Sequence, residues 1–173
     1  MKLKKGLVQI YTGNGKGKTT AALGLALRAA GAGLKVYILQ FLKSRSYSEI
    51  KALKKAKGIK IEQCGRGCII KRKPKKIDIE YAKKGFMKAR RIIMSAEYDI
   101  VILDEINIAL KMGLIKTKDS IGMIKHKPRR VELVLTGRYC PRTLHKHADL
   151  ITEMKEVKHP YKKGITARRG LEY

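Results

Sequence analysis

The stretch that most constrains this chain is YTGNGKGKTT, which runs from Tyr11 to Thr20. It follows a short apolar and β-branched run, LVQIY, and precedes an alanine-rich helical segment, Lys18 to Ala32. In such a turn, backbone N–H groups and the helix N-terminus surround phosphate, while a lysine and a bound Mg²⁺ neutralise its charge. The stretch therefore predicts a phosphate-binding loop (P-loop) between a strand and a helix.

The strict P-loop pattern requires glycine five positions before Gly17, where this chain has Thr12 followed by Gly13. We interpret the shift as a variation, because the turn still contains three glycines. Lys16 is either a second cation inside the loop or a solvent-facing side chain. The residues expected to contact the phosphates are Gly13, Asn14, Gly15, Lys16, Gly17, Lys18, Thr19 and Thr20.

A second motif, YDIVILDEIN, supports the first. Its apolar strand ends in Asp104 and Glu105, as in a Walker B segment, whose carboxylate holds Mg²⁺ directly or through water at the carboxyl end of a strand. We expect Thr19, with Asp104 or Glu105, to hold that metal. Glu105 is also in a position to orient water in a hydrolase. The two motifs together predict nucleotide binding.

Short strand-like runs alternate with longer helical ones along the chain. The alternation indicates βαβ units, and the nearly continuous apolar runs VYILQF and IVILDE are typical of strands covered on both faces. We expect one α/β domain over residues 1–173, with a doubly wound, mainly parallel sheet between helices. Strands are expected at 7–11, 35–41, 59–64, 99–105, 131–137 and 150–157, and helices at 18–32, 49–57, 79–96, 116–125 and 141–147.

Two segments look different from the rest. Residues 65–76, GRGCIIKRKPKK, are expected to form an irregular loop, and the tail from Lys158 lacks a clear period. The run ITEMKEV alternates as a half-buried edge strand would.

Charge leaves the class of partner open. The chain has 41 Lys and Arg against 14 Asp and Glu, a formal net charge of +27, which favours an anionic partner such as nucleic acid. However, the basic residues are spread along the whole chain with few aromatic residues among them, so solvated helix faces are the simpler interpretation. An acidic protein partner is a third possibility.

Other features point to a cytoplasmic protein. No run of 18 apolar residues occurs, and the N-terminus enters its first strand without the pattern of a signal peptide. Cys64, Cys68 and Cys140 are best explained as buried or free thiols. Neither CGRGC nor HKH with His159 supplies four convincing zinc ligands, and His159 and Pro160 are expected to shape a turn near the active site.

Several motifs together resemble one family over residues 7–173. TGNGKGKTTAALGLALRAAG, LQFLK, YDIVILDEINIALKMGLI, LTGRYCPRTLHKHADLITEMKEVKHPYKKGI and ARRGLEY are similar to the P-loop type of ATP:corrinoid adenosyltransferase. The resemblance implies that a corrinoid reduced to Co(I) attacks the 5′ carbon of ATP and that the whole triphosphate leaves. The protein would then position the reactants and stabilise charge on the leaving group, without a general base.

The resemblance also assigns roles. Lys18, Thr19 and Glu105 are the expected catalytic residues, and Arg138 in LTGR is either a phosphate or nucleotide contact or a solvated loop arginine. A homodimer is implied, and the basic surface suggests an acidic flavoprotein reductase as partner. Cys68 and Ile70 replace two aromatic residues expected to pack on the corrin, so the corrin contacts stay open.

Two alternatives remain. One is a basic nucleic-acid-binding P-loop ATPase. The other is a small P-loop kinase, which is disfavoured because no separate lid or acceptor motif stands out.

Overall fold

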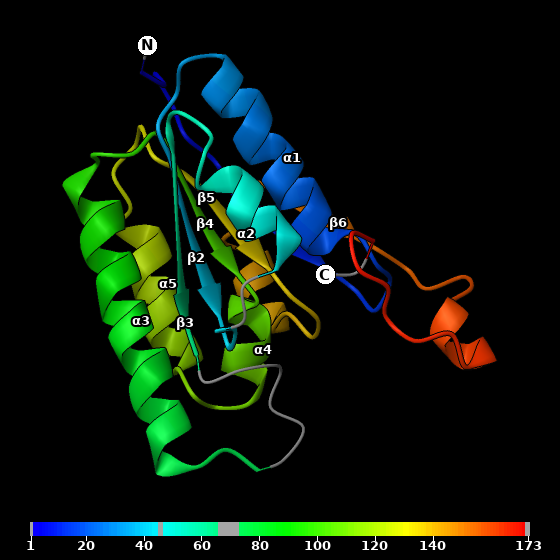
Figure 1. Cartoon of the computed structure of the whole chain (residues 1–173). Helices are drawn as coiled ribbons and strands as arrows, with labels where there is room; N and C mark the ends of the chain where they lie inside the picture. The colour runs from blue at the N-terminus through cyan, green and yellow to red at the C-terminus, as the bar shows by residue number, and fades with distance from the viewer. Residues whose placement is uncertain (1, 45–46, 66–72, 172–173) are drawn as a thin grey trace.

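The computed structural model of this chain describes residues 2–44, 47–65 and 73–171 (Figure 1). In these residues, strands and helices alternate along the chain as the sequence predicts, except that two helices follow the fourth strand. The strands are β1 Val8–Thr12, β2 Val36–Phe41, β3 Ile59–Cys64, β4 Ile100–Asp104, β5 Glu132–Thr136 and β6 Leu150–Glu153. The helices are α1 Lys18–Gly31, α2 Ser48–Leu53, α3 Lys76–Ser95, α4 Ile106–Lys111, α5 Thr117–Lys125, α6 Arg142–His145 and the 3₁₀ turn η1 Pro160–Lys163.

The six strands form one sheet in the order β3-β2-β4-β5-β1-β6, and every neighbouring pair is parallel. Because all strands run the same way, their carboxyl ends meet at one edge of the sheet, where α/β proteins bind ligands. β5 lies between β1, which leads into the phosphate loop, and β4, which ends in Asp104. The fold is a P-loop-like doubly wound α/β sheet.

Helices cover both faces of the sheet (Figure 1). α1 and α2 pack on one face, where alternate strand residues such as Ile38 and Ile102 are fully buried. α3, α4, α5 and α6 pack on the other, against residues such as Leu39 and Leu103. β2, β4 and β5 are buried along their whole length, because helices exclude water from both of their faces.

Among the helices, the largest differences from the expected boundaries are at α2, α3 and α4. α3 begins at Lys76 instead of Ile79, because Asp78 accepts a hydrogen bond from the Lys75 amide and so caps the helix. α4 was not expected from the sequence at all, and α2 ends at Leu53, before the expected Lys57. The segments predicted at 18–32, 116–125 and 141–147 all contain helices of nearly those bounds.

The expectation for β6 is wrong in two respects. The strand ends at Glu153 instead of residue 157, and all four of its residues are exposed rather than half-buried. β6 is an edge strand, as expected, and among the described strands it pairs only with β1, so its backbone hydrogen bonds hold it without burial of its side chains. The chain after β6 projects beyond this edge of the sheet, as the orange and red segment of Figure 1 shows.

No helix in the described part of the chain has the length and apolar character that crossing a membrane requires.

Candidate functional site

The phosphate loop connects the end of β1 to the start of α1, as predicted. Gly17 caps α1 in a left-handed conformation with φ 116°, and Gly13 has φ 96°, so both positions favour glycine. Gly15 is confined instead by close packing, because a Cβ there would lie 2.7 Å from the carbonyl oxygens of Met154 and Lys155. The glycines thus let the loop turn tightly against the chain that follows β6.

Within the loop, the side chains differ in exposure. Lys18 is buried, and its Nζ donates a 2.6 Å hydrogen bond to the carbonyl oxygen of Gly15, so the ammonium bends back over the loop. Burial lowers the pKa of Lys18, with Arg138 acting in the same direction and Glu105 opposing. Thr19 is half-buried, and Asn14 and Thr20 are exposed.

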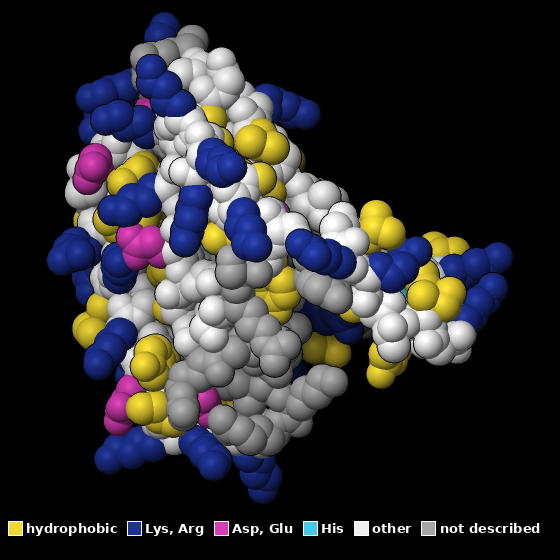
Figure 2. Space-filling model, in the orientation of Figure 1, with side chains coloured by type: hydrophobic (Ala, Val, Ile, Leu, Met, Phe, Trp, Pro, Cys, Tyr) yellow, Lys and Arg dark blue, Asp and Glu magenta, His cyan; other side chains and the backbone are white. Residues whose placement is uncertain are grey.

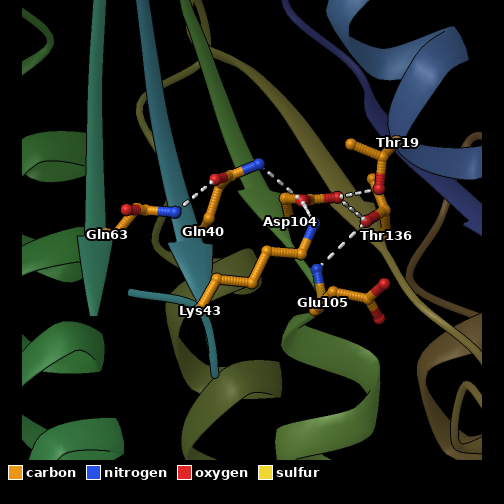
Figure 3. Close-up of polar contacts among 7 residues, drawn as sticks. All are labelled: Thr19, Gln40, Lys43, Gln63, Asp104, Glu105 and Thr136. Atoms are coloured by element: carbon orange, nitrogen blue, oxygen red, sulfur yellow. Dashed lines mark hydrogen bonds and ion pairs between the residues drawn. The ribbon is translucent and has the colours of Figure 1, made fainter. Parts of the chain in front are cut away.

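Asp104 is the centre of a buried hydrogen-bond network (Figure 3). Its Oδ1 accepts from the Oγ1 atoms of Thr19 at 2.8 Å and Thr136 at 2.6 Å. Its Oδ2 accepts from Nε2 of Gln40 at 3.1 Å and from Nζ of Lys43 at 2.9 Å. Both oxygens of this carboxylate are therefore engaged by donors from four different elements or loops.

The side chain of Glu105 has far fewer hydrogen-bond donors around it than that of Asp104. Its backbone is left-handed, with φ 61°, and its N–H donates a 3.1 Å hydrogen bond to Thr136 Oγ1. Its side-chain Oε2, however, is buried and accepts no hydrogen bond in the described structure. Burial, and next the charge of Asp104, raise the pKa of the Glu105 carboxyl above its ordinary value. A buried oxygen without a donor is costly unless a ligand or ion satisfies it.

Arg138 lies on the turn that follows β5. Gly137, with φ 128°, donates its N–H to the Tyr11 carbonyl at 3.1 Å and accepts a 3.1 Å hydrogen bond from Asn107 Nδ2. The turn is thereby fixed between the phosphate-loop strand and α4. Arg138 is half-buried, and its charge acts on Lys18 and Glu105. The structure thus places Arg138 at the same end of the sheet as the loop.

Lys16 extends in another direction. Its side chain is exposed, and its Nζ donates a 3.1 Å hydrogen bond to the carbonyl oxygen of Leu171 in the tail. Gly15 and Lys16 line a pocket of about 410 Å³ together with residues 155–161 and 165–168. His159 and Pro160 form part of this pocket, and the His159 ring accepts a 3.2 Å hydrogen bond from the Tyr161 amide, so the expected turn is present.

The sequence interpretation missed several residues of the site. Gln40, Lys43, Thr136 and Asn107 were not assigned, although all four contact the Walker B segment or the turn after β5. One signal was available. Gln40 interrupts an apolar strand, and Lys43 and Thr136 lie at or just beyond strand carboxyl ends, where ligand-binding residues gather in parallel sheets.

The cysteines and the expected corrin contacts are only partly described. Cys68 and Ile70 lie outside the described residues. Burial raises the pKa of Cys64 to about 12 and that of Cys140 to about 11.

In the described ranges, no three His, Cys, Asp or Glu side chains come together in a group able to hold a metal ion. A metal at Thr19, Asp104 and Glu105 would need further ligands from a bound phosphate or water.

Comparison with known proteins identifies the family. The family model described as ATP:corrinoid adenosyltransferase BtuR/CobO/CobP matches residues 4–173. A corrinoid adenosyltransferase from a Sinorhizobium species is 35% identical over 98% of this chain and 81% of its own length. The corrinoid adenosyltransferase of Escherichia coli strain K12 is 29% identical over 98% of this chain and 87% of its own.

Among solved structures, the fold resembles a KaiC-like protein from Pyrococcus horikoshii. The TM-score is 0.53 at 16% identity, and the match covers 89% of this chain and 75% of the other. This likeness supports the α/β fold alone. The family model and the relatives, which extend over nearly the whole chain, show that it belongs to the ATP:corrinoid adenosyltransferase family and is a transferase.

Proposed function

We propose that this enzyme transfers the 5′-deoxyadenosyl group of ATP to the Co(I) of a reduced corrinoid and releases triphosphate, in adenosylcobalamin biosynthesis or salvage. One observation supports this most directly. A phosphate loop with a buried lysine lies beside two acidic residues at the carboxyl edge of the sheet, in a chain of the corrinoid adenosyltransferase family. The loop would hold the leaving group rather than a phosphate to be hydrolysed.

The proposed reaction is a displacement at carbon. The cobalt lone pair forms a bond to the 5′ carbon, the bond between that carbon and the ribose 5′ oxygen breaks, and its electron pair stays on the triphosphate. Co(I) is thereby oxidised formally to Co(III), and no proton is transferred. The protein therefore needs no general base, and its task is to orient the reactants and stabilise negative charge on the triphosphate.

The cations of the site suit that task. The Lys18 ammonium lies within the loop, where its bond to the Gly15 carbonyl can be exchanged for one to a phosphate oxygen. Backbone amides of residues 13–20 and the start of α1 would contribute further donors. The charge of Arg138 acts to lower the pKa values of both Lys18 and Glu105. We therefore propose that Arg138 binds the same triphosphate.

Magnesium fits the oxygen atoms present. The buried Oε2 of Glu105 has no donor in the described structure, and Thr19 supplies a hydroxyl beside the Asp104 carboxylate. Mg²⁺ prefers such oxygen ligands, with one or two carboxylates and the remainder from phosphate and water. We therefore assign Glu105 and Thr19 as its ligands, with Asp104 adjacent. When bound, Mg²⁺ would neutralise charge on the triphosphate.

The products distinguish this reaction from those of an ATPase or a kinase. ATP labelled in the adenine and in the γ-phosphate should be incubated with enzyme, Mg²⁺ and chemically reduced corrinoid, and the products separated by chromatography. We expect γ-label in intact triphosphate and adenine label in a light-sensitive corrinoid, both dependent on the corrinoid. ADP and free phosphate, formed at a rate indifferent to the corrinoid, would contradict the proposal and favour the ATPase alternative.

The surface charge suggests how reducing equivalents arrive. Lys and Arg side chains are scattered over the face shown in Figure 2, between apolar and uncharged groups. We propose an acidic flavoprotein reductase as an encounter partner, attracted by the net charge of +27. Coupled activity should then fall as salt rises, whereas chemically reduced corrinoid should be adenosylated at a rate that changes much less. We also propose a homodimer, which sedimentation equilibrium would test.

A further inference from the structure

Lys43 lies in an unusual place for a lysine. It follows the end of β2, where Leu42 has a left-handed φ of 60°, and its side chain reaches across the carboxyl edge of the sheet to Asp104 (Figure 3). The side chain of Lys43 is only 12% exposed, and that of Asp104 is 1% exposed. Gly65 packs closely against the same turn. A Cβ at this position would lie 2.6 Å from the Lys43 backbone nitrogen, so the turn leaves no room for a larger residue.

The contact is an ion pair in a site that a divalent cation is expected to occupy. Among the described residues, Asp104 has four donors, of which three are neutral hydroxyl or amide groups and Lys43 is the charged one. Lys43 therefore provides the charge that a buried carboxylate needs when no metal is present.

Binding of Mg²⁺ would change the charges around Asp104. A divalent ion held by Thr19 and Glu105 would neutralise Asp104 directly or through a bound water, and it would repel an ammonium on the same carboxylate. The triphosphate that enters with the ion brings several negative charges to the same region. An ammonium on a flexible four-carbon stem can move from one anion to the other, whereas Gln40 and Thr136 are neutral and experience no such repulsion.

We propose that Lys43 is a counter-ion that Mg²⁺ displaces from Asp104, and that its freed ammonium then binds the triphosphate of the nucleotide. The inference rests on the proposed nucleotide and metal site, and it adds a residue that neither the phosphate-loop motif nor the Walker B motif contains. Lys43 would thus stabilise the empty site and, after loading, the leaving group.

The test uses Lys43→Met, which keeps an unbranched side chain one atom shorter and removes the charge. Lys60→Met is the matched control, because Lys60 is exposed and pairs with Glu62 at 3.5 Å instead of with Asp104. Binding of Mn²⁺ without nucleotide is measured by electron paramagnetic resonance. We expect Lys43→Met to bind Mn²⁺ about tenfold more tightly than wild type, because the competing cation is gone, and Lys60→Met to match wild type.

A second measurement tests the loaded state. Calorimetric titration with inorganic triphosphate at saturating Mg²⁺ should show affinity about tenfold weaker in Lys43→Met and unchanged in Lys60→Met. Opposite changes in metal and triphosphate affinity are a signature that a merely structural role would not produce. Unchanged or weaker Mn²⁺ binding in Lys43→Met overturns the displacement, and unchanged triphosphate affinity overturns the transfer of the ammonium.

Thermal unfolding shows whether the Lys43→Met variant is folded and whether metal restores its stability. Without metal, Lys43→Met should unfold at a lower temperature than wild type, and saturating Mn²⁺ should close most of that gap. If Lys43→Met does not yield folded protein, Lys43→Gln replaces it with the same expectations. Neither binding experiment requires a corrinoid. A wild-type enzyme that binds Mn²⁺ and triphosphate as described but forms ADP in the dual-label experiment would refute the proposed function and leave this inference intact.

Discussion

Thr19 and Asp104 are 85 positions apart in the sequence, yet Thr19 Oγ1 donates a 2.8 Å hydrogen bond to Asp104 Oδ1. The first residue belongs to α1 and the second ends β4, with β5 between their strands. The contact joins the phosphate-loop motif to the Walker B motif in the described structure. The Mg²⁺ that we propose would therefore find hydroxyl and carboxylate oxygens at one point, although the sequence presents them separately.

Replacing the threonine hydroxyl tests this junction. Thr19→Val keeps the shape of the side chain and removes both a proposed metal ligand and the donor to Asp104. We expect the Mg²⁺ concentration for half-maximal adenosylation to rise by about tenfold or more, with Asp104→Asn acting in the same direction. Titration of activity against Mg²⁺ gives the answer. Thr143→Val is the control, because Thr143 is exposed in α6 and is not assigned to the site. Equal Mg²⁺ requirements in all three variants would refute the metal assignment.

Lys18 supplies the second prediction. Its ammonium is the buried cation of the loop, and it contacts the Gly15 carbonyl rather than an acidic side chain in the described structure. Lys18→Ala should therefore leave the fold intact and weaken ATP binding or turnover by at least about tenfold, because one direct charge on the triphosphate is lost. Circular dichroism checks the fold, and equilibrium binding of ATP measures the effect. Wild-type affinity in a folded Lys18→Ala variant would contradict the phosphate-loop assignment.

Gly15 and Gly24 make a matched pair of glycines for a third prediction. A Cβ at Gly15 would overlap the backbone of Met154 and Lys155, whereas nothing lies within 4 Å of one at Gly24, which is exposed in the middle of α1. Gly15→Ala should push the loop away from the chain after β6, cost about 1–3 kcal/mol of stability and weaken triphosphate binding. Gly24→Ala should raise stability by about 0.5–1 kcal/mol.

Denaturant unfolding and triphosphate titration of the two variants decide this prediction. Equal behaviour of Gly15→Ala and Gly24→Ala would mean that the loop does not depend on its contact with Met154.

Much of the fold follows from local sequence signals. Buried strands such as β2 and β4 were predicted because apolar runs of this length between helical segments indicate a parallel sheet. The phosphate loop was predicted because its glycines, lysine and threonine stand at fixed spacing before a helix. α4 was missed because a six-residue helix that follows a left-handed Glu105 depends on packing against β5 more than on its own sequence.

The site was predicted less completely, for a physical reason. Motifs assign residues that are near in sequence, whereas Lys43 and Thr136 reach Asp104 only because β2, β4 and β5 end at the same edge of the sheet. No single segment of the sequence specifies the order of the strands in the sheet. Alternation in ITEMKEV predicted an edge strand, which the sheet order confirms, but it did not predict the exposure of that strand, where Leu150 and Ile151 are 42% and 40% exposed.

The last prediction concerns pH and a pair of charges away from the nucleotide. Lys88 Nζ donates to Glu62 Oε2, and Lys60 Nζ lies 3.5 Å from the other oxygen, Oε1. Burial alone would raise the pKa of the Glu62 carboxyl, but its interactions with Lys88, Lys60 and Tyr37 together outweigh burial, so the pKa is below its ordinary value of 4.5. A carboxyl whose pKa is lowered by folding stabilises the native state above its unfolded pKa, and that contribution disappears as pH falls through the folded pKa.

Glu62→Gln should therefore lower the free energy of unfolding at pH 7 by about 0.5–1 kcal/mol, since both lysines are partly exposed and water screens the pair. The difference from wild type should shrink as pH drops below 4.5, because protonation then removes the same charge from wild type. Urea unfolding at pH 7, 5 and 3 measures it. Glu80→Gln, at an exposed position of α3, serves as the control and should show no such trend. A deficit in Glu62→Gln that stays constant down to pH 3 would mean that the side-chain amide fails to pack, rather than that the ion pair stabilises the fold.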